Sequence, residues 1–110
     1  MSRDRILSLL GLATRSRKTV SGEFMVEKTV KTGGAMLVMV ANDVSDGSKK
    51  NYSDMCHFYE VPLVYYGTKE TLGHCIGKEI RAAVAVTDEG FANRIMELME
   101  ASTRNTEVTK

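Results

Sequence analysis

Cysteine, net charge and long hydrophobic runs are all scarce in this sequence of 110 residues. Its two cysteines, Cys56 and Cys75, lie in apolar helical patterns, which fits a reducing cytoplasm better than a disulfide scaffold. The longest apolar run, residues 35–41, is far too short to cross a bilayer, so we expect no membrane partner. Because the net charge is only +1, affinity for nucleic acid would need a local basic patch.

The motifs of several enzyme classes are absent as well. No GxGxxG follows a strand pattern, and neither GxxxxGK[ST] nor GxSxG occurs. The pairs Cys56-His57 and His74-Cys75 are adjacent on helices, where neighbouring side chains diverge, so we expect no metal site and no cofactor. Asp43 is predicted to be a turn or cap residue rather than a catalytic group. We therefore expect a protein that is not an enzyme.

Apolar periodicity predicts helices that alternate with short buried strands. Helices are expected over residues 2–16, 21–32, from 49 until Val61-Pro62, over 69–76 and from Asp88 onward. Strands are expected over residues 18–20, 35–41, 63–67 and 82–87. The first helix has its apolar residues at helical spacing, so we interpret it as a core helix rather than a signal peptide.

This alternation predicts an α/β fold, a three-layer α/β/α sandwich with a four-stranded mixed, mostly parallel sheet. We expect a single domain over residues 1–101 and a flexible polar tail over residues 102–110. A monomer is the expected state for a chain with so few aromatic residues.

The stretch VSGEFMVEK, residues 20–28, has the features of a helix start. Ser21 is predicted to cap the open backbone N–H groups, Gly22 leaves room for a close approach, and Glu23 suits the helix dipole. Two interpretations are open. The helix start packs in an ordinary way, or its N–H groups and Lys28 face a phosphate chain.

Basic residues gather at the predicted connections rather than in the middle of helices. They are Arg15, Arg17, Lys18, Lys49, Lys50, Lys69, Lys78 and Arg81. Each one taken alone is best interpreted as a solvated surface residue. Their common position at loops favours RNA binding modestly, although no aromatic pattern for base stacking on a sheet is present.

Three segments together resemble the ribosomal protein L7Ae superfamily: GEFMVEKTVKTGGAMLVMVANDVS, VPLVYYGTKETLGHCIGKE and RAAVAVTD. The resemblance runs from about Arg5 to Glu100 and is strongest to the bacterial YlxQ-type subgroup. It implies a small α/β/α sandwich that binds kink-turns and related bent RNA, as part of the translation machinery. Ribosomal RNA is the implied partner, with ribosomal proteins as further candidates.

The superfamily begins its RNA-binding helix with Gly-x-Asn-Glu-x-x-Lys, in which Asn and Glu read sheared G·A pairs. Here Gly22 and Lys28 match that pattern, but Phe24 and Met25 occupy the two reading positions. Neither side chain can read a guanine edge as an amide or a carboxylate does. The resemblance therefore implies phosphate contacts with weakened or changed base readout.

Two more loops correspond to the RNA surface of the superfamily, one after the buried strand and one before the last strand. The residues that we predict to bind RNA are Arg17, Lys18, Ser21, Gly22, Glu23, Lys28, Asn42, Asp43, Lys78, Glu79, Ile80 and Arg81. In the second loop, Lys78 and Arg81 are expected to meet phosphate and Ile80 to pack on a base. As an alternative, the chain is a protein-interaction module in which Phe24 and Met25 form an exposed apolar patch, unless Phe24 fills the core.

Overall fold

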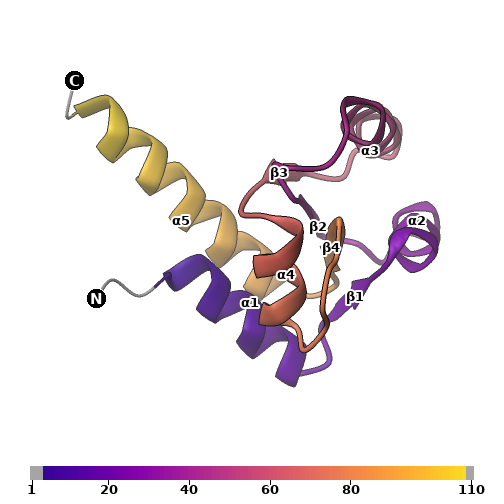
Figure 1. The fold of residues 1–110 in the computed structure, drawn as a ribbon, viewed down its shortest axis with the longest axis horizontal. Coiled ribbons are helices and arrows are strands. Elements are labelled where there is room, and N and C mark those ends of the chain that lie inside the picture. Colours follow the sequence, from indigo (N-terminus) through magenta and orange to yellow (C-terminus); the bar gives the residue numbers. More distant parts are fainter. Residues whose placement is uncertain (1–3, 109–110) are drawn as a thin grey trace.

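The computed structural model describes the backbone of residues 4–108. In that part of the chain, five helices alternate with four strands (Figure 1). The helices are α1 (Arg5–Arg15), α2 (Glu23–Lys31), α3 (Asp46–Phe58), α4 (Lys69–Cys75) and α5 (Glu89–Val108). The strands are β1 (Thr19–Ser21), β2 (Leu37–Val40), β3 (Leu63–Tyr65) and β4 (Ala83–Val86). The predicted alternation of elements is confirmed.

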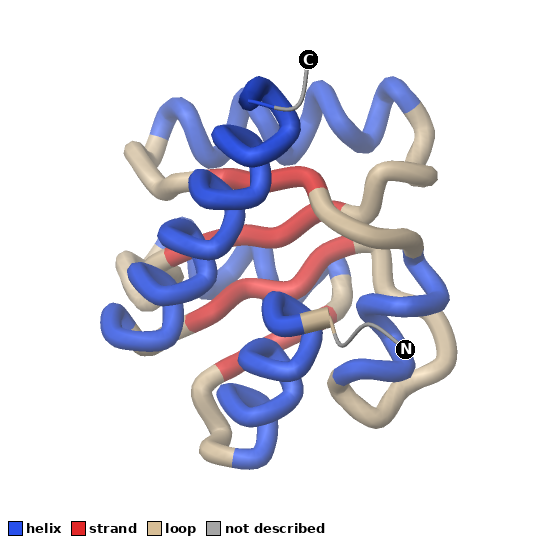
Figure 2. Tube along the Cα trace, turned by 90° about the vertical axis from the view of Figure 1, so that its left-hand side faces the viewer, coloured by secondary structure: helices blue, strands red, loops and turns tan. Residues whose placement is uncertain are grey.

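Helices cover both faces of the sheet, so the three-layer sandwich is confirmed. On one side α2 packs against β1 and β4, and α3 packs against β2. On the other side α1, α4 and α5 lie together, with α4 and α5 against β4 (Figures 1 and 2). Every residue of the two central strands, β2 and β4, is buried, as their uninterrupted apolar sequences predicted.

The sheet is mixed, with the strand order β1-β4-β2-β3. Only β2 and β3 are parallel, whereas β4 runs antiparallel to both of its neighbours, β1 and β2. The prediction of a mostly parallel sheet is therefore wrong. The apolar sequence of a short strand buried on both faces does not indicate whether the strand runs parallel or antiparallel to its neighbours. Its direction is defined only by its pairing with those neighbours.

Several predicted helix ends are confirmed by their hydrogen bonds. The Thr68 side chain accepts from the backbone N–H of Thr71 at 3.0 Å, which caps α4. Asp88 accepts from the N–H of Phe91 at 2.9 Å, at the start of α5. The expected break at Pro62 separates α3 from β3. Caps of this kind depend on local sequence alone, so the sequence identifies them.

Two other boundaries differ from the prediction. Helix α3 begins at Asp46, three residues earlier than expected, because the side chain of Ser45 accepts from the N–H of Ser48 at 3.1 Å. Helix α5 continues to Val108 instead of ending near residue 101. The part of the predicted tail at residues 109–110 lies outside the described residues. No helix in the described range is apolar enough over sufficient length to span a bilayer.

Candidate nucleic-acid interface

The loops that the sequence singled out converge at one end of the sheet. Ser21, the last residue of β1, pairs with Val84, and Val40, the last residue of β2, pairs with Ala83. The end of β1, the loop after β2 and the loop before β4 therefore meet where β4 begins. We call this region the sheet end and define it as residues 21–25, 42–43, 66–69 and 77–82.

Ser21 joins two of these segments. Its hydroxyl accepts a hydrogen bond from Nε of Arg81 at 3.0 Å. The prediction that Ser21 caps the next helix is therefore wrong, because Ser21 lies in β1 and Gly22 occupies the N-cap position with no side-chain cap. This bond fixes the guanidinium of Arg81 beside the start of α2.

Arg81 itself is held by two further hydrogen bonds. Its Nη1 donates to the carbonyl oxygen of Ile80 at 2.8 Å, and its backbone N–H donates to the carbonyl of Lys69 at 3.0 Å. A guanidinium has five N–H donors, and hydrogen bonds to other described residues use two of them. The half-buried Arg81 is thus positioned while keeping donors for an anionic ligand.

Asp43 ties the loop after β2 to helix α4. Its Oδ1 accepts from the backbone N–H of Lys69, the first residue of α4, at 2.8 Å. The interpretation of Asp43 as a turn or cap residue is confirmed, although the helix that it caps is distant in sequence. Next to it, the backbone N–H of Asn42 donates to the carbonyl of Gly67 at 2.9 Å, and the Asn42 side chain is exposed.

The loop before β4 packs closely on α4 at Gly73. A Cβ atom at this position would lie 2.6 Å from the carbonyl oxygen of Glu79 and 2.8 Å from the backbone nitrogen of Ile80. The Gly73 carbonyl also accepts from the N–H of Lys78 at 2.8 Å. The loop therefore has a rigid support, while Lys78, Glu79 and Ile80 are exposed, Ile80 by 56%. Gly73 was not predicted as a site residue. In the sequence it is marked only as a glycine within a helical pattern.

The start of α2 presents apolar side chains to solvent. Phe24 is 73% exposed and Met25 is 41% exposed, so the interpretation of Phe24 as core filler is wrong. Glu23 and Lys28 are exposed too. Because Gly22, at φ 91°, offers no side chain, no side-chain cap bonds the first backbone N–H groups of α2.

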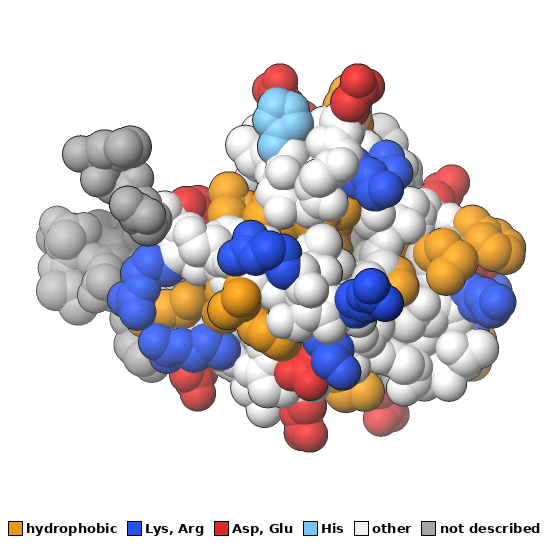
Figure 3. All heavy atoms as spheres, turned by 90° about the horizontal axis from the view of Figure 1, so that it is seen from below, with side chains coloured by type: hydrophobic (Ala, Val, Ile, Leu, Met, Phe, Trp, Pro, Cys, Tyr) orange, Lys and Arg blue, Asp and Glu red, His pale blue; other side chains and the backbone are white. Residues whose placement is uncertain are grey.

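Arg17 and Lys18 lie apart from the sheet end. They precede β1, and the carbonyl of Lys18 accepts from the N–H of Thr87, at the far end of the β1–β4 pairing. Two strand residues lie between Lys18 and Ser21, so the two residues are three steps, roughly 10 Å, apart along the strand. Seen from below (Figure 3), Lys and Arg side chains are spread over the face that includes α1, with hydrophobic side chains between them. Most Asp and Glu side chains lie toward the edges of that view.

A long-range hydrogen bond also anchors the end of β3. The hydroxyl of Tyr66 donates to Oδ2 of Asp4, the N-cap residue of α1, at 2.6 Å. Burial, followed by this bond and the charge of Asp4, raises the pKa of Tyr66 to about 12. The phenol therefore stays protonated and remains a donor at neutral pH.

Both cysteines are packed as neutral thiols. Burial raises the pKa of Cys56 to about 11, and burial with the nearby Asp4 raises the pKa of Cys75. Cys75 donates its S–H to the carbonyl of Leu7 at 2.7 Å. Within residues 4–101, no group of three His, Cys, Asp or Glu side chains is arranged to hold a metal ion. The thiolate form that binds metals is disfavoured at both positions.

Comparison with known proteins gives three matches of direct use. The profile of the "Ribosomal protein L7Ae/L30e/S12e/Gadd45 family" matches residues 4–96. "RNA-binding protein YlxQ" of Bacillus subtilis (strain 168) is 46% identical over 92 residues, which cover 84% of this chain and 92% of the relative. The "Large ribosomal subunit protein eL8" of Thermoplasma volcanium is 33% identical over 87 residues, 78% of this chain and 72% of that protein.

A solved structure shows the same fold. The structure of a protein with unknown function from Bacillus halodurans superposes with a TM-score of 0.85 and 37% sequence identity. It covers 89% of this chain and 99% of that one, so the likeness extends over the whole sandwich.

Proposed function

This chain belongs to the ribosomal protein L7Ae/L30e/S12e/Gadd45 family, and from that premise we propose that it binds structured RNA at the sheet end. The RNA is a bent, kink-turn-like element, ribosomal RNA in the first instance, and recognition is mainly of phosphates. The protein acts as a monomer of the cytoplasmic translation machinery, with ribosomal proteins as candidate neighbours and without catalysis. Its similarity to an RNA-binding protein and to a ribosomal protein supports this proposal.

The observation that carries the proposal is the bond between Ser21 and Arg81. This bond brings together the start of α2 and the loop before β4, at residues 60 positions apart in the sequence. The family resemblance implies RNA contacts for each of these two segments. Since the guanidinium keeps free donors beside the uncapped start of α2, a phosphate placed there would meet charge and backbone N–H groups together.

Side chains of the sheet end, together with the neighbouring Lys28 of α2, have different roles in this proposal. Lys28, Lys78 and Arg81 contact phosphates, which positions the RNA without reading its sequence. Ile80, exposed at the loop tip, packs on an unstacked base. Phe24 and Met25 replace the two readers of sheared G·A pairs, so a standard kink-turn is bound less tightly than in relatives with Asn and Glu.

Fluorescence anisotropy with a standard kink-turn RNA and with ribosomal RNA, at low and moderate salt, tests the proposal. Affinity should fall steeply with salt, because phosphate contacts release counterions. The triple variant Lys28→Gln, Lys78→Gln, Arg81→Gln should lose affinity and reduce the slope of log K against log salt by about 2 to 3.

A matched control removes the same charge elsewhere. Lys31, Lys50 and Arg94 form exposed intrahelical ion pairs away from the sheet end. Their triple change to Gln should leave most of the RNA affinity intact. Equal losses in both triple variants would mean that binding depends on total charge, and the sheet end would then be abandoned as the site.

A protein-interaction role for the same surface is the alternative, and the exposure of Phe24 and Met25 favours it. The RNA titration separates the two roles. Binding to ribosomal RNA but not to the kink-turn supports phosphate contacts with a new readout. Binding to neither RNA contradicts the proposal and makes Phe24 and Met25 the centre of a protein contact.

A further inference from the structure

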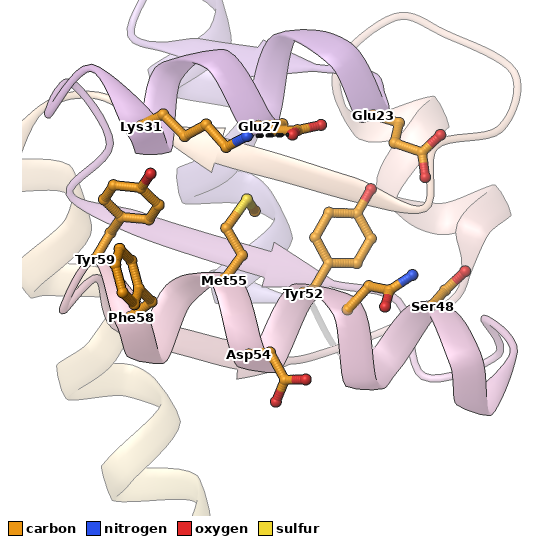
Figure 4. Close-up of a pocket in the computed structure, with 10 residues that line it drawn as sticks. Glu23, Glu27, Lys31, Ser48, Tyr52, Asp54, Met55, Phe58 and Tyr59 are labelled. Atoms are coloured by element: carbon orange, nitrogen blue, oxygen red, sulfur yellow. Dashed lines mark hydrogen bonds and ion pairs between the residues drawn. The ribbon is translucent and has the colours of Figure 1, made fainter.

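A groove lies between α2 and α3, on a different face of α2 from its exposed Phe24 and Lys28. Its volume is about 440 Å³, within the usual range for sites that hold a ligand or a peptide side-chain cluster. Figure 4 shows the two helices running alongside each other, with side chains of both directed into the space between them. This groove was not predicted from the sequence.

Aromatic and apolar side chains form the base and one end of the groove. Tyr52, which is buried, and the half-buried Met55 project from α3 toward α2 (Figure 4). At the C-terminal end of α3, Phe58 is 76% exposed and packs edge-to-face with Tyr59, with ring centroids 4.9 Å apart. Two large aromatic rings therefore stand beside the groove in contact with solvent.

Carboxylates dominate the charge of the groove. Its lining includes Glu23, Glu27 and Asp54 but only one cation, Lys31. Lys31 is paired with Glu27 at 2.7 Å, and Asp54 is paired with Lys50 at 2.9 Å. Glu23 has no ion pair or side-chain hydrogen bond among the described residues. The pKa of Tyr52 is raised, mainly by burial and then by the charges of Glu23 and Glu27.

Along α2, this surface adjoins the proposed RNA interface and shares with it only Glu23, whose side chain lines the groove. Glu23, Glu27 and Lys31 follow each other at four-residue intervals and form one stripe along the helix. Phe24 and Lys28 form the adjacent stripe, about 100° further round. A phosphate chain would be repelled by the first stripe, so the groove suits a ligand of the opposite charge.

We propose that the groove between α2 and α3 binds a cationic, amphipathic segment of a partner protein. A Lys or Arg of that segment engages the free carboxylate of Glu23, and its apolar side chains cover Tyr52 and Met55. Charge complementarity and the exposed rings of Phe58 and Tyr59 select this occupant, since guanidinium and ammonium groups bind both carboxylates and aromatic faces. The stem of a long cationic side chain can cover apolar surface while its charged end reaches Glu23.

Titration followed by ¹H–¹⁵N correlation spectra tests the proposal. The probe is a short synthetic helical peptide with Arg and Leu on one stripe, and the control is the same peptide with Glu in place of Arg. Chemical shifts should change for Glu23, Glu27, Tyr52 and Met55 with the Arg peptide only. Shift changes centred elsewhere, equal responses to both peptides, or no response would each overturn the proposal.

Single substitutions sharpen the test, because they change the charge without touching the core. Glu23→Gln should weaken binding of the Arg peptide about fivefold, the effect of losing one exposed charge pair. Lys31→Gln should tighten binding, because it removes the competing cation from Glu27. Glu70→Gln and Arg94→Gln remove one negative and one positive charge outside the groove and should leave peptide affinity unaltered. If the matched pairs behave alike, attraction is unspecific and the groove is not the site.

Two other occupants are distinguished in the same spectra. A second copy of the chain would shift the groove signals with protein concentration in the absence of peptide. RNA in the groove would shift the signals of Glu27, Tyr52 and Met55, which lie outside the sheet end, when RNA is added alone. Either result overturns the choice of a cationic protein segment. Neither depends on whether RNA binds at the sheet end, so the two proposals succeed or fail separately.

Discussion

The sheet end and the groove between α2 and α3 use their polar side chains in opposite ways. At the sheet end, hydrogen bonds join residues that are 26, 60 and 62 positions apart: Asp43 with Lys69, Ser21 with Arg81, and Asp4 with Tyr66. In the groove, the ion pairs of Glu27 with Lys31 and of Lys50 with Asp54 each lie within a single helix.

This difference indicates which of the two surfaces is held in place before a ligand binds. Long-range bonds fix loops relative to one another, and a surface that is held before binding loses less conformational entropy when a ligand arrives. Pairs within one exposed helix do not fix α2 relative to α3, and such pairs contribute little stability. The sheet end therefore suits recognition of a defined RNA shape, and the groove suits an adaptable contact with a flexible segment.

The largest effect is expected at the support of the sheet end. Gly73→Ala places a Cβ against the backbone of Glu79 and Ile80, so the loop must move. We expect a loss of about 1–3 kcal/mol in the free energy of unfolding, as for overpacked interiors, together with weaker RNA binding. Urea denaturation and anisotropy measure the two effects.

Gly47→Ala is the matched control for that variant. Gly47 also lies in a helix, α3, but the nearest atom to its added Cβ is 4.0 Å away, in the side chain of Ser45. This change should be neutral or slightly stabilising, since Ala favours helices over Gly. If both glycine variants behave alike, the close approach at Gly73 has no importance for the sheet end.

A somewhat smaller effect is expected from restoring the family readers. The double change Phe24→Asn, Met25→Glu should raise the affinity for a standard kink-turn about tenfold, the range of one good base contact. Thermal unfolding should be nearly unchanged, because both side chains are exposed. The gain should vanish with an RNA whose sheared G·A pairs are replaced by Watson–Crick pairs. A gain that persists with this RNA would show that the two positions do not read those pairs.

Removal of one long-range bond should cost about 1 kcal/mol. Tyr66→Phe loses the hydrogen bond to Asp4, and urea denaturation near neutral pH measures the difference from the original protein. Because the pKa of Tyr66 is raised from 10 to about 12, the bond stabilises the fold below pH 10, and this contribution is lost as the pH rises from 10 through about 12. The difference between the two proteins should therefore shrink over that range. A constant difference would mean that the hydroxyl acts through packing alone.

The smallest effect is expected for an ion pair of the groove rim. Lys50→Gln removes the exposed partner of Asp54 and should change the free energy of unfolding by less than about 0.5 kcal/mol. Urea denaturation at low and high salt gives the value. A loss as large as that of Tyr66→Phe would contradict the distinction between long-range bonds at the sheet end and local pairs in the groove.

Much of the fold could be predicted because its determinants are local. The uninterrupted apolar sequences of β2 and β4, the caps at Thr68 and Asp88, and the break at Pro62 each act within a few residues. For the candidate site, the resemblance pointed to loops that meet at one end of the sheet, but Arg17 and Lys18 lie at the other end of β1. Their distance from Ser21 depends on strand pairing, which the sequence alone does not define.

The sequence is sufficient to predict the alternation of elements and the buried central strands, and it places the apolar residues Phe24 and Met25 at the start of α2. Tertiary structure alone decided the direction of β4, which follows from its pairing between β1 and β2. Tertiary structure also makes Ser21 a hydrogen-bond partner of Arg81 rather than the predicted helix cap. It places α2 beside α3, and the groove lies between these two helices. Local rules govern hydrogen bonds within a few residues, whereas contacts between distant segments depend on how the whole chain packs.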